Sequence, residues 1–306
     1  MQTKRMATGR SRKQGNTKDR QCDNEAAKLA VEIALAWQER HAQQFSLVPI
    51  NLNALAEEVG ISVERNSGRA RGAYLVRSKT DSRTQYTMVL PPEMCTEKRR
   101  IAMAHEIGHF AFERLESRPK WEPKAIEHFA DIFAEEILVP ATYASCSIRK
   151  YLQQADPTEL IRASRRIYGV SVFMLLNVVK RRPAIMEQCN SVWLLARYQA
   201  NRVTGLDPRL RIIQAVFDRN RVYVPTNKSV AALLGDLSWL ASCSFGRTVM
   251  REGASIEVWA KTGHEKPKYK QVRVSATLRV TKLRPAAGTG TPFFVFSVSI
   301  LLPSRL

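Results

Sequence analysis

Apolar residues recur every three to four positions early in the chain, the spacing that places side chains on one face of an α-helix. From Asn24 onward, Ala30, Ile33, Ala34 and Trp37 follow this spacing. We therefore predict a long amphipathic helix that starts near Asn24. Residues 1–23 are rich in Lys and Arg and contain almost nothing apolar, so we expect a disordered basic tail before the helix.

Several short elements come next. A short helix is predicted after Pro49, with Gly60 as its C-terminal cap. Residues 61–64, 72–76 and 85–90 have strand-like composition and are predicted as three strands. Residues 85–90 are our candidate for an edge strand that grips a peptide by strand addition. An internal strand is the equal alternative for the same residues.

Two longer helical patterns cover residues 96–115 and 123–139. Pro123 suits the first turn of the second helix, because its missing N–H is not needed there. Gly108 lies inside the first helix, where glycine costs about 1 kcal/mol relative to alanine. We expect another helix, or a metal site, to approach the chain closely at Gly108.

Residues 148–185 form a basic helical region in which two helices flank a turn at Gly169. This order resembles a helix-turn-helix and permits a DNA-binding interpretation. The second helix opens with the apolar run 172–176 and offers few groups to base edges. The composition therefore favours a unit that packs internally or docks a repressor.

The pattern changes to strands after Pro183. Five strands are predicted, over residues 191–198, 209–217, 255–260, 271–282 and 293–302, and one helix over residues 229–241. The run 271–280 alternates apolar and polar side chains, as a half-exposed antiparallel strand does. The chain is therefore predicted to have an α+β fold. We expect it to divide into the tail at residues 1–23 and three regions at residues 24–147, 148–185 and 186–306.

The charge of the chain is strongly positive. The formal net charge is +20, which suggests attraction to nucleic acid or to an acidic protein face. Solubility combined with a basic tail explains the same charge, and charge alone does not choose between the two.

Cysteine use and the absence of targeting segments point to the cytoplasm. The five cysteines are dispersed and form no C-x-x-C pair, which is typical of reduced thiols in a cytosolic protein. No apolar run reaches the length of a membrane span. The basic N-terminus lacks the apolar core of a secretory signal. We expect a cytoplasmic protein without a membrane partner.

The candidate chemistry begins with HEIGH at residues 105–109. His105 and His109 are four residues apart, so on a helix they project from one face and can hold one Zn²⁺ together. Glu106 between them can accept a proton from water at the metal. An ordinary amphipathic helix with two hydrogen-bonded histidines is the alternative.

The next predicted helix supplies matching carboxylates. Glu127 and Asp131 are four residues apart and share a helix face. If this helix is antiparallel to the HEIGH helix, Glu127 becomes a third zinc ligand. Asp131 can then accept the outer N–H of a ligand histidine and fix its tautomer.

Together these residues resemble the ImmA/IrrE family of metallopeptidases. Its pattern is close to R-x-x-x-A-H-E-[IL]-G-H, followed by E-x-x-A-[ND]-x-F-A-x-E-[IL]-L-x-P. The chain has RIAMAHEIGH at 100–109 and EHFADIFAEEILVP at 127–140. The resemblance covers roughly residues 25–185, and it is most specific in these two blocks.

The resemblance implies a cytosolic, zincin-like endopeptidase with a small sheet and the HEIGH helix, which cleaves a helix-turn-helix repressor. It implies that His105, His109 and Glu127 bind zinc, that Glu106 is the general base and that Asp131 supports the site. A His₂Glu set also accepts Mn²⁺. Some members carry a GAF-like sensor domain where this chain has residues 186–306. A plain structural domain is the alternative there.

An oxyanion donor is also needed for peptide hydrolysis. Tyr74, His128 and Tyr143 are the candidates, although a buried tyrosine more often only packs. His128 points about 100° away from its neighbour Glu127 on a helix and is not expected to be a ligand.

Two functions from other classes compete with the peptidase interpretation. A non-proteolytic regulator would bind a repressor or DNA through the basic surface, but it would have no use for Glu106. A cell-wall hydrolase is disfavoured, because the sequence shows no export signal.

Overall fold

The fold is described from a computed structural model. It describes residues 11–41, 48–65, 72–79, 84–187, 189, 191–199, 209–217, 222–223, 240, 243–262, 268–284 and 293–300. The chain divides into two compact units. Unit 1 contains Met1–Pro140 and Ile167–Val170, and unit 2 contains Ala141–Arg166 and Ser171–Leu306.

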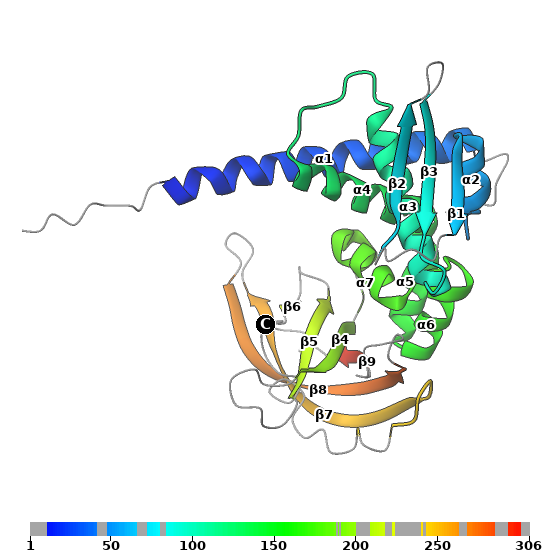
Figure 1. Ribbon diagram of the computed structural model, residues 1–306. Helices are drawn as coiled ribbons and strands as arrows, with labels where there is room; N and C mark the ends of the chain where they lie inside the picture. Colours follow the sequence, from blue (N-terminus) through cyan, green and yellow to red (C-terminus); the bar gives the residue numbers. More distant parts are fainter. Residues whose placement is uncertain are drawn as a thin grey trace, which may run out of the picture. The chain divides into compact units, whose positions relative to one another are not determined.

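Within the part that the structure describes, unit 1 combines four helices with a three-stranded sheet (Figure 1). Its helices are α1 (Ser11–His41), α2 (Leu52–Glu58), α3 (Thr96–Glu113) and α4 (Pro123–Leu138). Its strands are β1 (Ile61–Arg65), β2 (Tyr74–Lys79) and β3 (Thr84–Leu90). These elements agree closely with the predicted helices and strands, except at the start of α1.

The first helix is longer than the sequence pattern predicted. α1 begins at Ser11, so residues 11–23 of the expected disordered tail are helical, and residues 1–10 lie outside the described residues. Further along, α1 packs against α4. The Trp37 ring meets Phe133 edge-on at a centroid distance of 5.4 Å. The buried Gln38 amide donates a hydrogen bond of 2.7 Å to the carbonyl of Glu136.

The sheet order is β1-β3-β2, which makes β3 the central strand. β3 pairs in parallel with β1 and antiparallel with β2. The edge-strand interpretation of residues 85–90 is therefore wrong, and the internal alternative is confirmed. The physical reason is burial, because Tyr86, Met88 and Leu90 are all buried, whereas β2 is exposed along most of its length. β2 is an edge strand among the described residues.

α3 and α4 approach each other closely at Gly108. A Cβ atom at this position would lie 3.0 Å from the Cα and 3.2 Å from the carbonyl oxygen of Ala130, and 3.2 Å from the Phe133 ring. These distances leave no room for a side chain. The close approach that we expected from a glycine inside the helix is therefore confirmed, and the partner is α4.

Arg100 joins α3 to two other segments of unit 1. Its guanidinium donates hydrogen bonds to the carbonyls of Ile50, at 2.9 Å, and Tyr168, at 3.5 Å. Burial lowers the pKa of Arg100. Gly169 lies directly against this side chain, with a φ of +63° and no space for a Cβ atom. Both constraints explain a glycine at this turn.

In its described residues, unit 2 combines three α-helices and a short 3-10 helix with a six-stranded sheet (Figure 1). Its helices are α5 (Ala141–Gln154), α6 (Pro157–Arg166), α7 (Val172–Arg181) and η1 (Pro183–Ile185). Its strands are β4 (Ser191–Gln199), β5 (Arg209–Val216), β6 (Val222–Tyr223), β7 (Thr248–Thr262), β8 (Lys268–Leu283) and β9 (Phe293–Ile300). Neighbouring strands in the order β5-β4-β9-β8-β7-β6 are antiparallel.

Helices α5 to α7 group with this sheet, so they do not stand apart as the separate region expected at 148–185. Ser297 of β9 donates a hydrogen bond to the carbonyl of Ala155, between α5 and α6, and Ser191 of β4 donates one to Leu152 at 3.0 Å. Most side chains of α7 are buried, with Phe173 a large exposed exception. This burial favours internal packing, rather than contact with DNA bases, as the role of α7 in the helix-turn-helix-like region.

Some predictions for unit 2 fall outside the described residues. The helix expected at 229–241 lies almost entirely in that part of the chain, and Leu240 alone is described. The GAF-like interpretation therefore stays a prediction. Within the described residues, no helix is both long enough and apolar enough to cross a membrane.

Gly108→Ala tests the contact between α3 and α4. The added methyl group must push Ala130 away, and overpacking of this kind costs about 1–3 kcal/mol. This cost exceeds the roughly 1 kcal/mol that alanine contributes through helix propensity. We expect a lower free energy of unfolding in urea. Gly72→Ala is the control, because its Cβ would meet nothing within 4 Å. A Gly108→Ala variant as stable as the parent would contradict this packing.

Candidate metal centre

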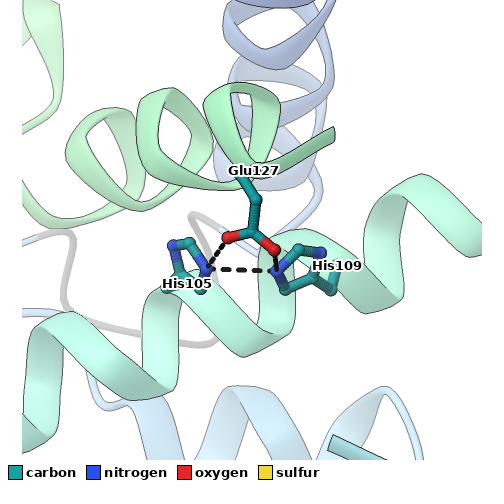
Figure 2. A group of neighbouring side chains, drawn as sticks. All are labelled: His105, His109 and Glu127. Atoms are coloured by element: carbon teal, nitrogen blue, oxygen red, sulfur yellow. Dashed lines mark hydrogen bonds and ion pairs between the residues drawn. The ribbon is translucent and has the colours of Figure 1, made fainter. Parts of the chain in front are cut away.

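Three potential metal donors converge from α3 and α4 (Figure 2). His105 and His109 lie one turn apart on α3, and Glu127 reaches toward both from α4. The two Nε2 atoms are 3.1 Å apart. The Glu127 carboxylate oxygens lie 3.2 Å from Nε2 of His105 and 3.5 Å from Nε2 of His109. His105 contacts Asp131, and Phe112, which is later on α3, contacts Phe129, which is earlier on α4. These two contacts are those of helices that run in opposite directions.

The donor set fits a zinc ion. Zinc binds imidazole nitrogen and carboxylate oxygen at about 2.0–2.2 Å, so two donors of a tetrahedral site lie about 3.3 Å apart. The separation of 3.1 Å between the two Nε2 atoms is close to that value. Oε2 of Glu127 lies 3.2 Å from Nε2 of His105 and Oε1 lies 3.5 Å from Nε2 of His109, and donor atoms taken one from each residue lie within 4.8 Å of one another. Three protein donors also leave a fourth position, as catalytic rather than structural zinc sites do.

Asp131 lies on the outer side of His105. Its Oδ1 is 3.0 Å from Nδ1 of His105, so Nδ1–H donates to the carboxylate and Nε2 faces the cluster. Burial lowers the pKa of His105, but the hydrogen bond and charge of Asp131, with the nearby Glu106 and Glu127, raise it above its ordinary value. Burial and the neighbouring His105 lower the pKa of His109. The two rings are therefore held in different electrostatic surroundings.

Glu106 faces the same space without joining the donor cluster. Burial raises the pKa of its carboxyl group, while His105 and a hydrogen bond from the backbone N–H of Leu75 oppose that shift. A raised pKa makes the carboxylate a stronger base. Leu75 belongs to the strand β2, so this strand lies beside the Glu106 carboxyl group.

A cleft of about 980 Å³ contains these groups. One side is lined by β2 and the other by α4 and the loop that joins it to α3. Its lining residues beyond the cluster and Glu106 include Tyr74, Leu75, Arg77, Glu113, Trp121 and Ile126. Sequence reasoning missed the loop residues, because no local pattern shows which loop folds back over a site.

The three candidates for the oxyanion donor lie in different parts of the structure. Tyr74 lines the cleft from β2 and is 42% exposed. His128 lies on α4 but belongs neither to the donor cluster nor to the cleft lining. Tyr143 lies on α5, in unit 2. Of the three, only Tyr74 shares the cleft with Glu106 within unit 1.

Comparisons with known proteins point to one family. No curated protein matches the chain. A solved structure described as a Mycobacterium tuberculosis transcriptional regulator is 13% identical, with a TM-score of 0.40, over 92% of this chain and 76% of the other. Residues 56–179 match the Peptidase_M78 family, described as the IrrE N-terminal-like domain. This match covers the HEIGH block and the block at 127–140, so the resemblance to the ImmA/IrrE family is confirmed over these residues.

Proposed function

We propose that this protein is a zinc-dependent endopeptidase that cleaves a helix-turn-helix transcriptional repressor, and so switches on a stress-response or mobile-element programme. The observation that carries the peptidase part is the cluster of His105, His109 and Glu127 with Glu106 in one open cleft. The repressor as substrate rests on the family resemblance alone.

The chain's residues divide into ligands and a base. His105, His109 and Glu127 would hold the metal, and Asp131 would keep His105 oriented with Nε2 toward it. When bound, zinc supplies a Lewis acid that acidifies water and polarises a peptide carbonyl. Mn²⁺ is the alternative ion for the same donors.

Glu106 moves the proton. Its carboxylate accepts a proton from the attacking water and later gives it to the leaving amine. The hydrogen bond from the Leu75 N–H orients the carboxyl group, and burial keeps the group basic. Tyr74 is the remaining candidate for stabilising the developing oxyanion, because it lines the cleft beside Glu106.

β2 is the candidate strand for binding the peptide. It is an edge strand among the described residues, and Ala73, Tyr74, Leu75 and Arg77 line the cleft. An extended peptide can add to such an edge through main-chain hydrogen bonds. This arrangement would place the scissile bond near Glu106, since Leu75 contacts that residue directly.

Glu106→Gln tests the peptidase function against the non-proteolytic regulator. We expect the zinc-loaded wild type to cut the repressor encoded beside its gene, and the variant to bind zinc but cut at least about 100-fold more slowly, because the base is lost. Electrophoresis and metal analysis give the two readouts. If both proteins leave the repressor intact yet release it from DNA, the binding regulator is the correct function.

His105→Ala tests the metal site. We expect the wild type to bind one zinc ion per chain and the variant to lose it, because one of three protein donors is gone. His128→Ala is the matched control, since this histidine is adjacent to Glu127 but lies outside the cluster. Metal content after dialysis is the measurement. A His105→Ala protein that keeps one zinc per chain would rule out this site.

Asp131→Asn tests the support of the ligand histidine. Loss of the carboxylate weakens the hydrogen bond to His105 Nδ1, and such changes typically reduce metal affinity by about 10–100-fold. Competition with a chromophoric chelator measures the affinity. Glu122→Gln removes one negative charge from the residue preceding α4 without touching a histidine, and it should leave the affinity unchanged. An equal loss of metal affinity in Asp131→Asn and Glu122→Gln would mean that the change in net charge alone is responsible.

A further inference from the structure

The cleft continues past the metal cluster toward the C-terminal end of α3. Phe112, Glu113 and Glu116 follow His109 along that wall. β2 reaches the same end, because Arg77 Nη1 lies 3.9 Å from the Glu113 carboxylate. A peptide lying along β2 would therefore pass from Glu106 toward this end of the cleft.

Trp121 provides an apolar surface at this end. The loop that carries it joins α3 to α4 (Figure 1). Its ring stacks on Phe112 with centroids 5.5 Å apart and planes 20° apart. Phe129 lies 5.3 Å from Phe112 and 6.4 Å from Trp121. Both phenylalanines are buried, so they hold the half-buried indole in place while it lines the cleft.

The rest of this wall does not favour a charged side chain. Pro119 and Ile126, which also line the cleft, are apolar. The charged residues at the rim are exposed and of both signs: Glu116, Arg118 and Lys120. Exposed charges of mixed sign give little net attraction for either sign of ligand. Burial of an apolar side chain against the indole is the stronger source of selectivity.

We propose that Trp121 is the floor of a specificity subsite that takes an apolar side chain of the peptide substrate. Phe112, beneath the indole, is three residues beyond His109, a rise of about 4.5 Å along the helix. An extended peptide advances about 3.3 Å per residue. The selected side chain therefore lies one or two residues from the scissile bond. This inference rests on the proposed peptidase function.

The test is a cleavage profile. A library of random dodecapeptides is digested with the zinc-loaded full-length protein, and mass spectrometry locates the cut bonds. We expect the wild type to prefer Leu, Ile, Met or Phe at one position near the cut. Trp121→Ala should lower kcat/KM for peptides with these residues by at least about tenfold, with the preferences at all other positions unchanged.

Two further variants make the result specific. Trp121→Phe keeps a ring on Phe112 and should retain most of the preference, which also provides a test if the alanine variant does not fold. Lys124→Ala lies at the start of α4 outside the cleft lining and should match the wild type. The subsite alone is overturned if the wild type cleaves peptides and both Trp121 variants show the same cleavage profile as the wild type. It is also overturned if the variants weaken the preferences at all positions equally. No cleavage of any peptide or of the repressor overturns the peptidase function and the subsite with it.

Discussion

The contact between α3 and α4 at Gly108 is the constraint on which the metal cluster depends. His105 and His109 lie on α3 and Glu127 lies on α4, so the distances of 3.2 and 3.5 Å between the histidine nitrogens and the Glu127 carboxylate depend on how closely the two helices approach. Gly108 lies between the two histidines in sequence, and a Cβ there would touch the backbone of Ala130. The same closeness brings Asp131 to the outer nitrogen of His105. The missing side chain at Gly108 thus allows α4 to bring both Glu127 and Asp131 to the histidines of α3.

Both helices of this pair are braced by other segments. α1 packs on α4 through Trp37 and Phe133 and through the Gln38 hydrogen bond. α3 is connected through Arg100, whose half-buried guanidinium donates hydrogen bonds to the carbonyls of Ile50 and Tyr168. These two hydrogen bonds link α3 to two other segments of unit 1. The bracing lies away from the cleft and leaves the metal cluster open on its substrate side.

The parts of the site that depend on local spacing were predictable from the sequence. Four-residue spacing placed His105 with His109 and Glu127 with Asp131, and Gly108 indicated a close helix neighbour. Long-range pairing was not predictable in the same way. The strand at residues 85–90 has the same composition whether it is internal or at an edge, and only its burial between β1 and β2 decides. Trp121 carried no signal either, because its importance comes from stacking on a residue of another helix.

The metal donors of unit 1 and part of its cleft lining come from elements that differ in stiffness. Metal donors need positions fixed to a few tenths of an ångström, and these come from two packed helices. The cleft lining also includes residues of the edge strand β2 and of the loop between α3 and α4. Loop and edge residues tolerate substitution better than a packed core does. The strand and loop residues of the lining can therefore be substituted while Gly108, Ala130 and the three cluster residues keep their positions.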